Sequence, residues 1–76
     1  PNPAQTYTVL TYTLESPSPV EISVSGISGN KMASWNFYEN HSGNHCFAIG
    51  VKKFTPGIYF FTLRTPGGSV THKFVK

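Results

Sequence analysis

Acidic side chains are scarce in this sequence. Aspartate is absent, glutamate occurs at three positions, and charged residues of both signs make up only 12% of the 76 residues. Because general acid–base catalysis draws largely on carboxylates and histidines, few catalytic pairs can be assembled. The chain also has no nucleophile-elbow motif and no glycine-rich phosphate loop that opens a helix. We therefore expect no catalytic residue, no small-molecule substrate and no cofactor.

Cysteine is almost as rare. Cys46 is the single cysteine, so no disulfide can form within the chain and the redox compartment stays open. His41, His45 and Cys46 lie close together in sequence, but a structural zinc site needs four ligands. His45 and Cys46 are also neighbours in an expected strand, where their side chains point to opposite faces. We expect no metal site.

Long apolar runs and clusters of positive charge are also missing. The longest aromatic and aliphatic run, residues 58–61, is far shorter than the roughly 20 residues of a membrane-spanning helix. The net charge is +3, but Lys and Arg occur singly or as one pair, whereas nucleic-acid-binding domains concentrate positive charge on one face. We expect no nucleic-acid partner. No signal peptide is visible, and a chain that starts at Pro1 is expected to be a fragment of a longer protein.

Residues that favour β-structure dominate what is present. Aromatic residues make up 14% of the chain, Thr, Ser and Val are abundant, and seven glycines and six prolines are spread along it. Apolar and polar residues alternate in segments of strand length, and no helical period occurs. We expect strands at residues 7–15, 20–24, 32–38, 45–51, 58–65 and 69–75. The sequence predicts one all-β domain over residues 1–76, an antiparallel sandwich of six to seven strands.

Four sequence blocks carry a family resemblance. They are PNPA at residues 1–4, VEISVSGISG at 20–29, PGIYFFTL at 56–63 and GSVTHKFVK at 68–76. In order and spacing, along the whole chain, the set resembles the type A C-terminal sorting domains of the type IX (Por) secretion system of Bacteroidetes. The resemblance implies an Ig-like sandwich that serves as a non-catalytic secretion signal.

That family also implies partners and a route. An upstream signal peptide takes the linked passenger into the periplasm, and the sorting domain then engages the outer-membrane secretion machinery. In many members a sortase-like peptidase removes the domain and attaches the passenger to anionic lipopolysaccharide, so the passenger reaches the cell surface or the extracellular space. The positions that match the C-terminal tail of the family are Lys73, Phe74, Val75 and Lys76, and the resemblance implies that the exporter recognises these residues.

The closing strand allows two interpretations. Its alternation puts His72 and Phe74 on an apolar face and Lys73 on the other. In the structural interpretation Phe74 belongs to the core, His72 is a hydrogen-bonded histidine inside the sandwich, and the lysines protect an edge strand from aggregation. In the functional interpretation the unpaired backbone edge is a strip on which the exporter docks by strand addition.

Gly29, Gly57, Tyr59 and Gly68 are expected to be structural. The glycines permit turns and a tight entry into a strand. A buried Tyr59 needs a partner for its hydroxyl, as at the corners of Ig-like sandwiches. Stacking of a ligand on Tyr59 is the competing interpretation.

A second class of function stays open. If Trp35, Tyr38, Phe60 and Tyr7 form one outward patch, the domain would be an accessory Ig-like binding or spacer module of a secreted enzyme or adhesin. Single exposed aromatic residues would not support this alternative. A chain that continues well past Lys76 would also favour it.

Overall fold

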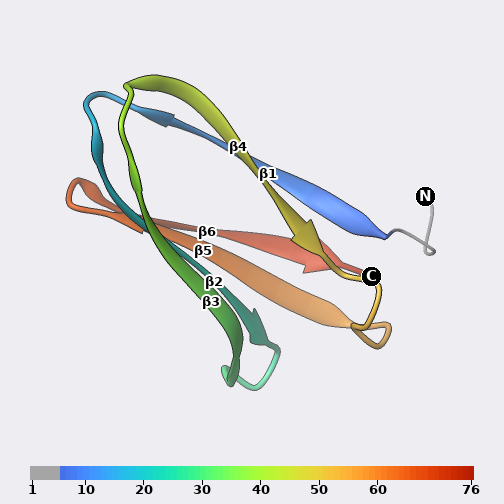
Figure 1. Ribbon diagram of the computed structural model, residues 1–76. Helices are drawn as coiled ribbons and strands as arrows, with labels where there is room; N and C mark the ends of the chain where they lie inside the picture. Colours follow the sequence, from blue (N-terminus) through green and yellow to red (C-terminus); the bar gives the residue numbers. More distant parts are fainter. Residues whose placement is uncertain (1–5) are drawn as a thin grey trace.

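The chain forms two antiparallel sheets in the computed structural model, which describes residues 6–76 (Figure 1). Within these residues the strands are β1 (Tyr7–Leu14), β2 (Ser18–Gly26), β3 (Lys31–Glu39), β4 (Gly43–Gly50), β5 (Ile58–Thr65) and β6 (Gly68–Val75). One sheet contains β1 and β4, and the other has the order β3-β2-β5-β6. No helix that could cross a membrane occurs in the described part of the chain. The prediction of an all-β antiparallel sandwich is confirmed.

The alternation of buried and exposed residues is clearest in β1. In β1 the side chains of Leu10, Tyr12 and Leu14 are buried, whereas those of Thr11 and Thr13 between them are exposed. A period of two places every second side chain on the core face, as expected for a sheet with one face toward solvent. The observed ends of the strands differ from the expected ones by at most two residues.

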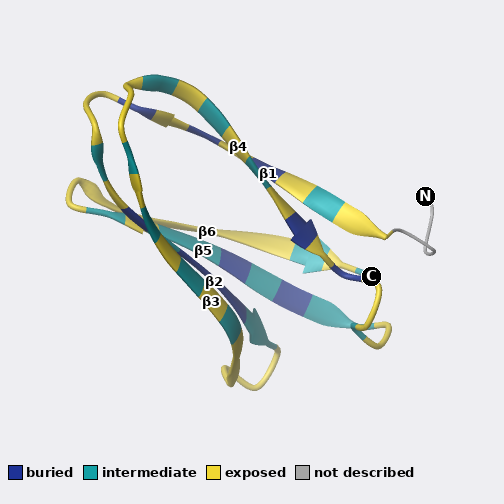
Figure 2. Cartoon of the chain, viewed as in Figure 1, coloured by how far each residue is buried: buried dark blue, intermediate teal, exposed yellow. Residues whose placement is uncertain are grey.

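The core lies between the two sheets and is centred on β2. Ile22, Val24 and Val51 are 0% exposed and Ile49 is 1% exposed, so these aliphatic side chains form the most deeply buried part of the core. Figure 2 shows buried residues on β2, β5, β1 and β4. Burial of such side chains supplies most of the free energy that holds a domain of this size together.

Aromatic rings close one side of the sandwich. Phe47 of β4 packs against Trp35 and Phe37 of β3, with ring centroids 5.3 Å and 5.4 Å apart. β3 and β4 are consecutive in sequence but belong to different sheets, so this contact joins the two layers. Trp35 and Phe37 are therefore partners of the core.

The opposite side is open because the sheets differ in width. Two strands face four, and β6 is the last strand of the wider sheet. Val70, on the core-facing side of β6, is 49% exposed, and His72 is exposed as well. The expectation of a hydrogen-bonded His72 inside the sandwich is wrong, because no strand of the described chain covers this part of β6.

Candidate docking strand

β6 is an edge strand with a long exposed surface. Among the described strands it pairs with β5 alone, and every residue of it except Phe74 is exposed (Figure 2). The other edge of the same sheet, β3, carries a bulge at Met32, where the register with β2 shifts. Bulges disturb an edge for further pairing. The regular, exposed edge of this sheet is therefore that of β6.

The register with β5 shows which backbone groups of β6 are unpaired. Gly57 and Lys76 exchange two backbone hydrogen bonds, of 3.3 Å and 2.9 Å, and so form a hydrogen-bonded pair. Such pairs alternate with non-hydrogen-bonded pairs along an antiparallel ladder. Following the register from Gly57, the β6 residues whose N–H and C=O groups point away from β5 are Ser69, Thr71, Lys73 and Val75. These groups form the free edge.

The four predicted recognition residues divide into two kinds. Lys73 is exposed, Val75 is 63% exposed, and both lie on the outer face of the sheet. Phe74 points inward and stacks on Phe61, with ring centroids 5.2 Å apart. The ammonium group of Lys76 is held by backbone carbonyl groups. Two residues thus face solvent, and two anchor the strand.

The residues predicted to be structural lie at the corners of the fold. Gly29 has φ of 90° in the β2–β3 turn and Gly68 has φ of 139° at the start of β6, conformations that residues with a Cβ rarely adopt. Gly57 precedes β5 and pairs with Lys76. Tyr59 is 6% exposed, and its hydroxyl donates to the carbonyl of Thr55. A ligand could not stack on a ring in this buried position.

Comparison with known proteins identifies the family of the chain. The family model described as "secretion system C-terminal sorting domain" matches residues 1–76, which is the whole chain. The chain belongs to this family. No curated protein and no solved structure matches it. The PNPA block of the sorting domain lies at residues 1–4, outside the described residues.

The space beside β6 adds to its accessibility. A cavity of about 700 Å³ opens between the β1–β2 connection and the β5–β6 turn of the sorting domain. Ser69 and Val70 at the start of β6 line it, together with Leu14 and Leu63 from the two sheets. The first half of β6 is thus reachable from its edge and from the core-facing side.

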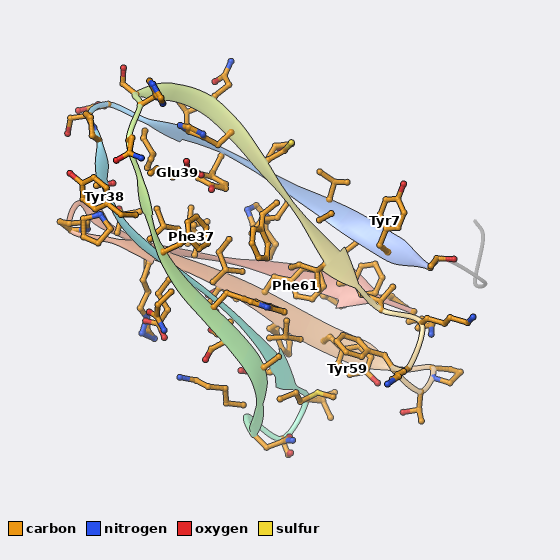
Figure 3. The ribbon with its side chains drawn as sticks, viewed as in Figure 1. Tyr7, Phe37, Tyr38, Glu39, Tyr59 and Phe61 are labelled. Atoms are coloured by element: carbon orange, nitrogen blue, oxygen red, sulfur yellow. The ribbon has the colours of Figure 1, made fainter. Side chains whose placement is uncertain are left out.

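Aromatic residues of the sorting domain do not form one outward patch. Tyr7 is 59% exposed on β1 and Tyr38 is 57% exposed on β3, in different sheets (Figure 3). Trp35 faces the core, and Phe60 is half-buried. The single outward patch of aromatic residues that the sequence left open is therefore not formed. Within residues 6–76 no group of three His, Cys, Asp or Glu side chains could hold a metal ion, and Cys46 is exposed.

A polar cluster inside the sandwich was not foreseen. The Tyr12 hydroxyl donates to Glu39 Oε2 at 2.7 Å, and His45 Nδ1 lies 3.4 Å from Glu39 Oε1. The His45 ring stacks on Tyr12, and its Nε2 lies 2.8 Å from the His41 carbonyl oxygen. All three side chains occupy core-facing positions of their strands. Polar residues at positions that alternation places on the core face are the sequence signal from which this cluster could have been predicted.

The cluster makes the stability of the domain depend on pH. Burial, and then the hydrogen bond to the Glu39 carboxylate, raise the pKa of Tyr12 well above its usual value of about 10. A raised pKa in the folded state stabilises the fold below the unfolded pKa, and this contribution is lost as the pH rises above it.

We expect Tyr12→Phe to lower the free energy of unfolding at pH 7 by about 1–3 kcal/mol, because Glu39 loses its donor. Between roughly pH 10 and 12 the variant should lose less stability than the wild type. Urea unfolding at several pH values measures both effects, and the exposed Tyr38→Phe is the control. Parallel pH profiles for the wild type and Tyr12→Phe would contradict the assignment.

Proposed function

We propose that this sorting domain, as a single Ig-like unit of residues 1–76, directs an upstream passenger through the type IX outer-membrane exporter without catalysing a reaction. The observation that carries the proposal is the free edge of β6, with its row of unpaired N–H and C=O groups. Such an edge can accept a strand from a partner, which gives affinity through main-chain hydrogen bonds.

Side chains on the outer face supply the specificity in this proposal. Lys73 and Val75 belong to the residues whose backbone groups form the free edge, and their side chains reach outward, so a partner strand meets one cation and one aliphatic group. Phe74 and Lys76 act from the other side by holding the strand in place. The exporter thus recognises a strand rather than a pocket.

The route that we propose follows from membership of the family. The linked passenger crosses the inner membrane first, and the exporter then engages the folded domain in the periplasm. A sortase-like peptidase is a further proposed partner, which removes the domain once the passenger has reached the cell surface. Both proposed partners are proteins, and the proposal includes no nucleic acid and no cofactor.

A reporter fusion tests the proposal. The 76-residue chain is attached to the C-terminus of a periplasmic reporter in a strain that has the type IX exporter. We expect the reporter outside the cell with the complete domain and in the periplasm when residues 73–76 are removed. Strains without the exporter provide the control. Retention of both fusions in the periplasm would contradict the proposal.

A further inference from the structure

The ammonium group of Lys76, directly after β6, lies among three backbone carbonyl oxygens. Its Nζ donates to the carbonyl oxygens of Val51 at 2.6 Å, Lys52 at 3.0 Å and Phe54 at 2.8 Å. An ammonium group has three N–H donors, so every donor has a partner. The backbone of Lys76 is fixed as well, through its two hydrogen bonds with Gly57.

The carbonyl groups belong to the β4–β5 connection, residues 51–57, which is anchored to the core. Val51 is 0% exposed, and its carbonyl also accepts the N–H of Phe54 at 3.1 Å. The Phe54 ring packs on Tyr59, with centroids 4.8 Å apart, and the Tyr59 hydroxyl bonds to Thr55. The carbonyl oxygens are therefore held where the ammonium group meets them.

We propose that Lys76 is a latch that fixes the end of the docking strand to the β4–β5 connection. It is a positioning residue: the exporter meets β6 in the place that the latch sets and does not read the charge of Lys76. Lys73 is the exposed cation on β6, and it has no ion pair among the described residues. Only the statement about the exporter rests on the proposed function.

Lysine suits this position better than arginine. The three oxygen atoms converge on one nitrogen, at 2.6, 3.0 and 2.8 Å. A compact ammonium group can serve three acceptors around one point, whereas the planar guanidinium group spreads its donors over a fork. A contact that needed only positive charge would accept either residue, so Lys76→Arg separates the two roles.

Competitive acylation of the folded 76-residue chain tests the latch without the exporter. The reaction of each lysine amine with acetic anhydride is followed by mass spectrometry. Because its donors are occupied, Lys76 should react about tenfold more slowly than Lys53 and Lys73, and the difference should vanish in urea. Equal rates for Lys76 and Lys73 in the folded chain would overturn the proposal.

Substitutions test what the latch does to the strand. In Lys76→Met and in Lys76→Arg, the amides of Gly57 and residue 76 should exchange hydrogen about tenfold faster by NMR. Lys53→Met, which removes a charge from the same connection, should leave them unchanged. If Lys76→Arg kept wild-type protection, the three-carbonyl geometry would not be needed, and the latch would be refuted.

Export of the reporter fusion completes the test. Lys76→Met and Lys76→Arg should both reduce export to a similar degree, because both release the strand. Normal export of Lys76→Arg together with failure of Lys76→Met would show that the charge is read directly, and would overturn the proposal. If the wild-type fusion is not exported, the proposed function fails, whereas acylation and hydrogen exchange still decide whether the latch exists.

Discussion

Thr71→Pro is expected to reduce export of the reporter fusion at least about tenfold while the domain stays folded. The Thr71 N–H points to the free edge, so proline removes no hydrogen bond to β5. The ring instead removes a donor that a partner strand needs and places a carbon atom where that strand would approach. Export and thermal unfolding of the same variant measure the two effects.

The control for this variant is Thr71→Val. Valine keeps the N–H and the β-branched shape, and it also removes the 3.1 Å contact between the Thr71 and Thr62 hydroxyl oxygens. We expect wild-type export from Thr71→Val and a change in stability below about 1 kcal/mol for both variants. Wild-type export of the proline variant would rule out docking on this edge. If the proline variant were unfolded, the Thr71 N–H would be bonded to β5, and the assignment of the free edge would be wrong.

Ile22→Ala is expected to have the largest effect on stability, about 2–5 kcal/mol. Ile22 is 0% exposed and lies in β2 between Trp35 of β3 and Leu63 of β5. Neighbours on both sides hold the cavity open, so it cannot easily collapse. The free energy of unfolding of a small domain is only roughly 5–15 kcal/mol, so the substitution should remove a large share of the stability.

Ile27→Ala is the matched control for the core variant. Ile27 follows β2 in the turn to β3 and is 71% exposed, so its truncation should change the free energy of unfolding by less than about 0.5 kcal/mol. Urea unfolding monitored by Trp35 fluorescence compares both variants with the wild type. Equal midpoints for Ile22→Ala and the wild type would contradict the placement of Ile22 at the centre of the core.

Much of the fold could be predicted from local patterns. Leu10, Tyr12 and Leu14 fall on one face of the alternating segment that forms β1, so the period of two predicts which side chains share a face. Proline and glycine between the alternating segments mark the turns. The candidate docking strand, β6, could also be located from the sequence, because its sequence block carries the family resemblance and its alternation separates Lys73 from Phe74.

The sequence by itself therefore determined the strands, the alternation of their side chains and the family. Tertiary structure alone decided two hydrogen bonds: the one from the Lys76 ammonium group to the Val51 carbonyl, 25 residues apart, and the one from Tyr12 to Glu39, 27 residues apart. It also left His72 uncovered, since the width of the opposite sheet depends on how all strands pack. The physical reason is the sequence distance over which each feature is set. The period of the side chains is a local property of the backbone, whereas contacts between distant segments depend on how the whole chain packs and leave no local sequence pattern.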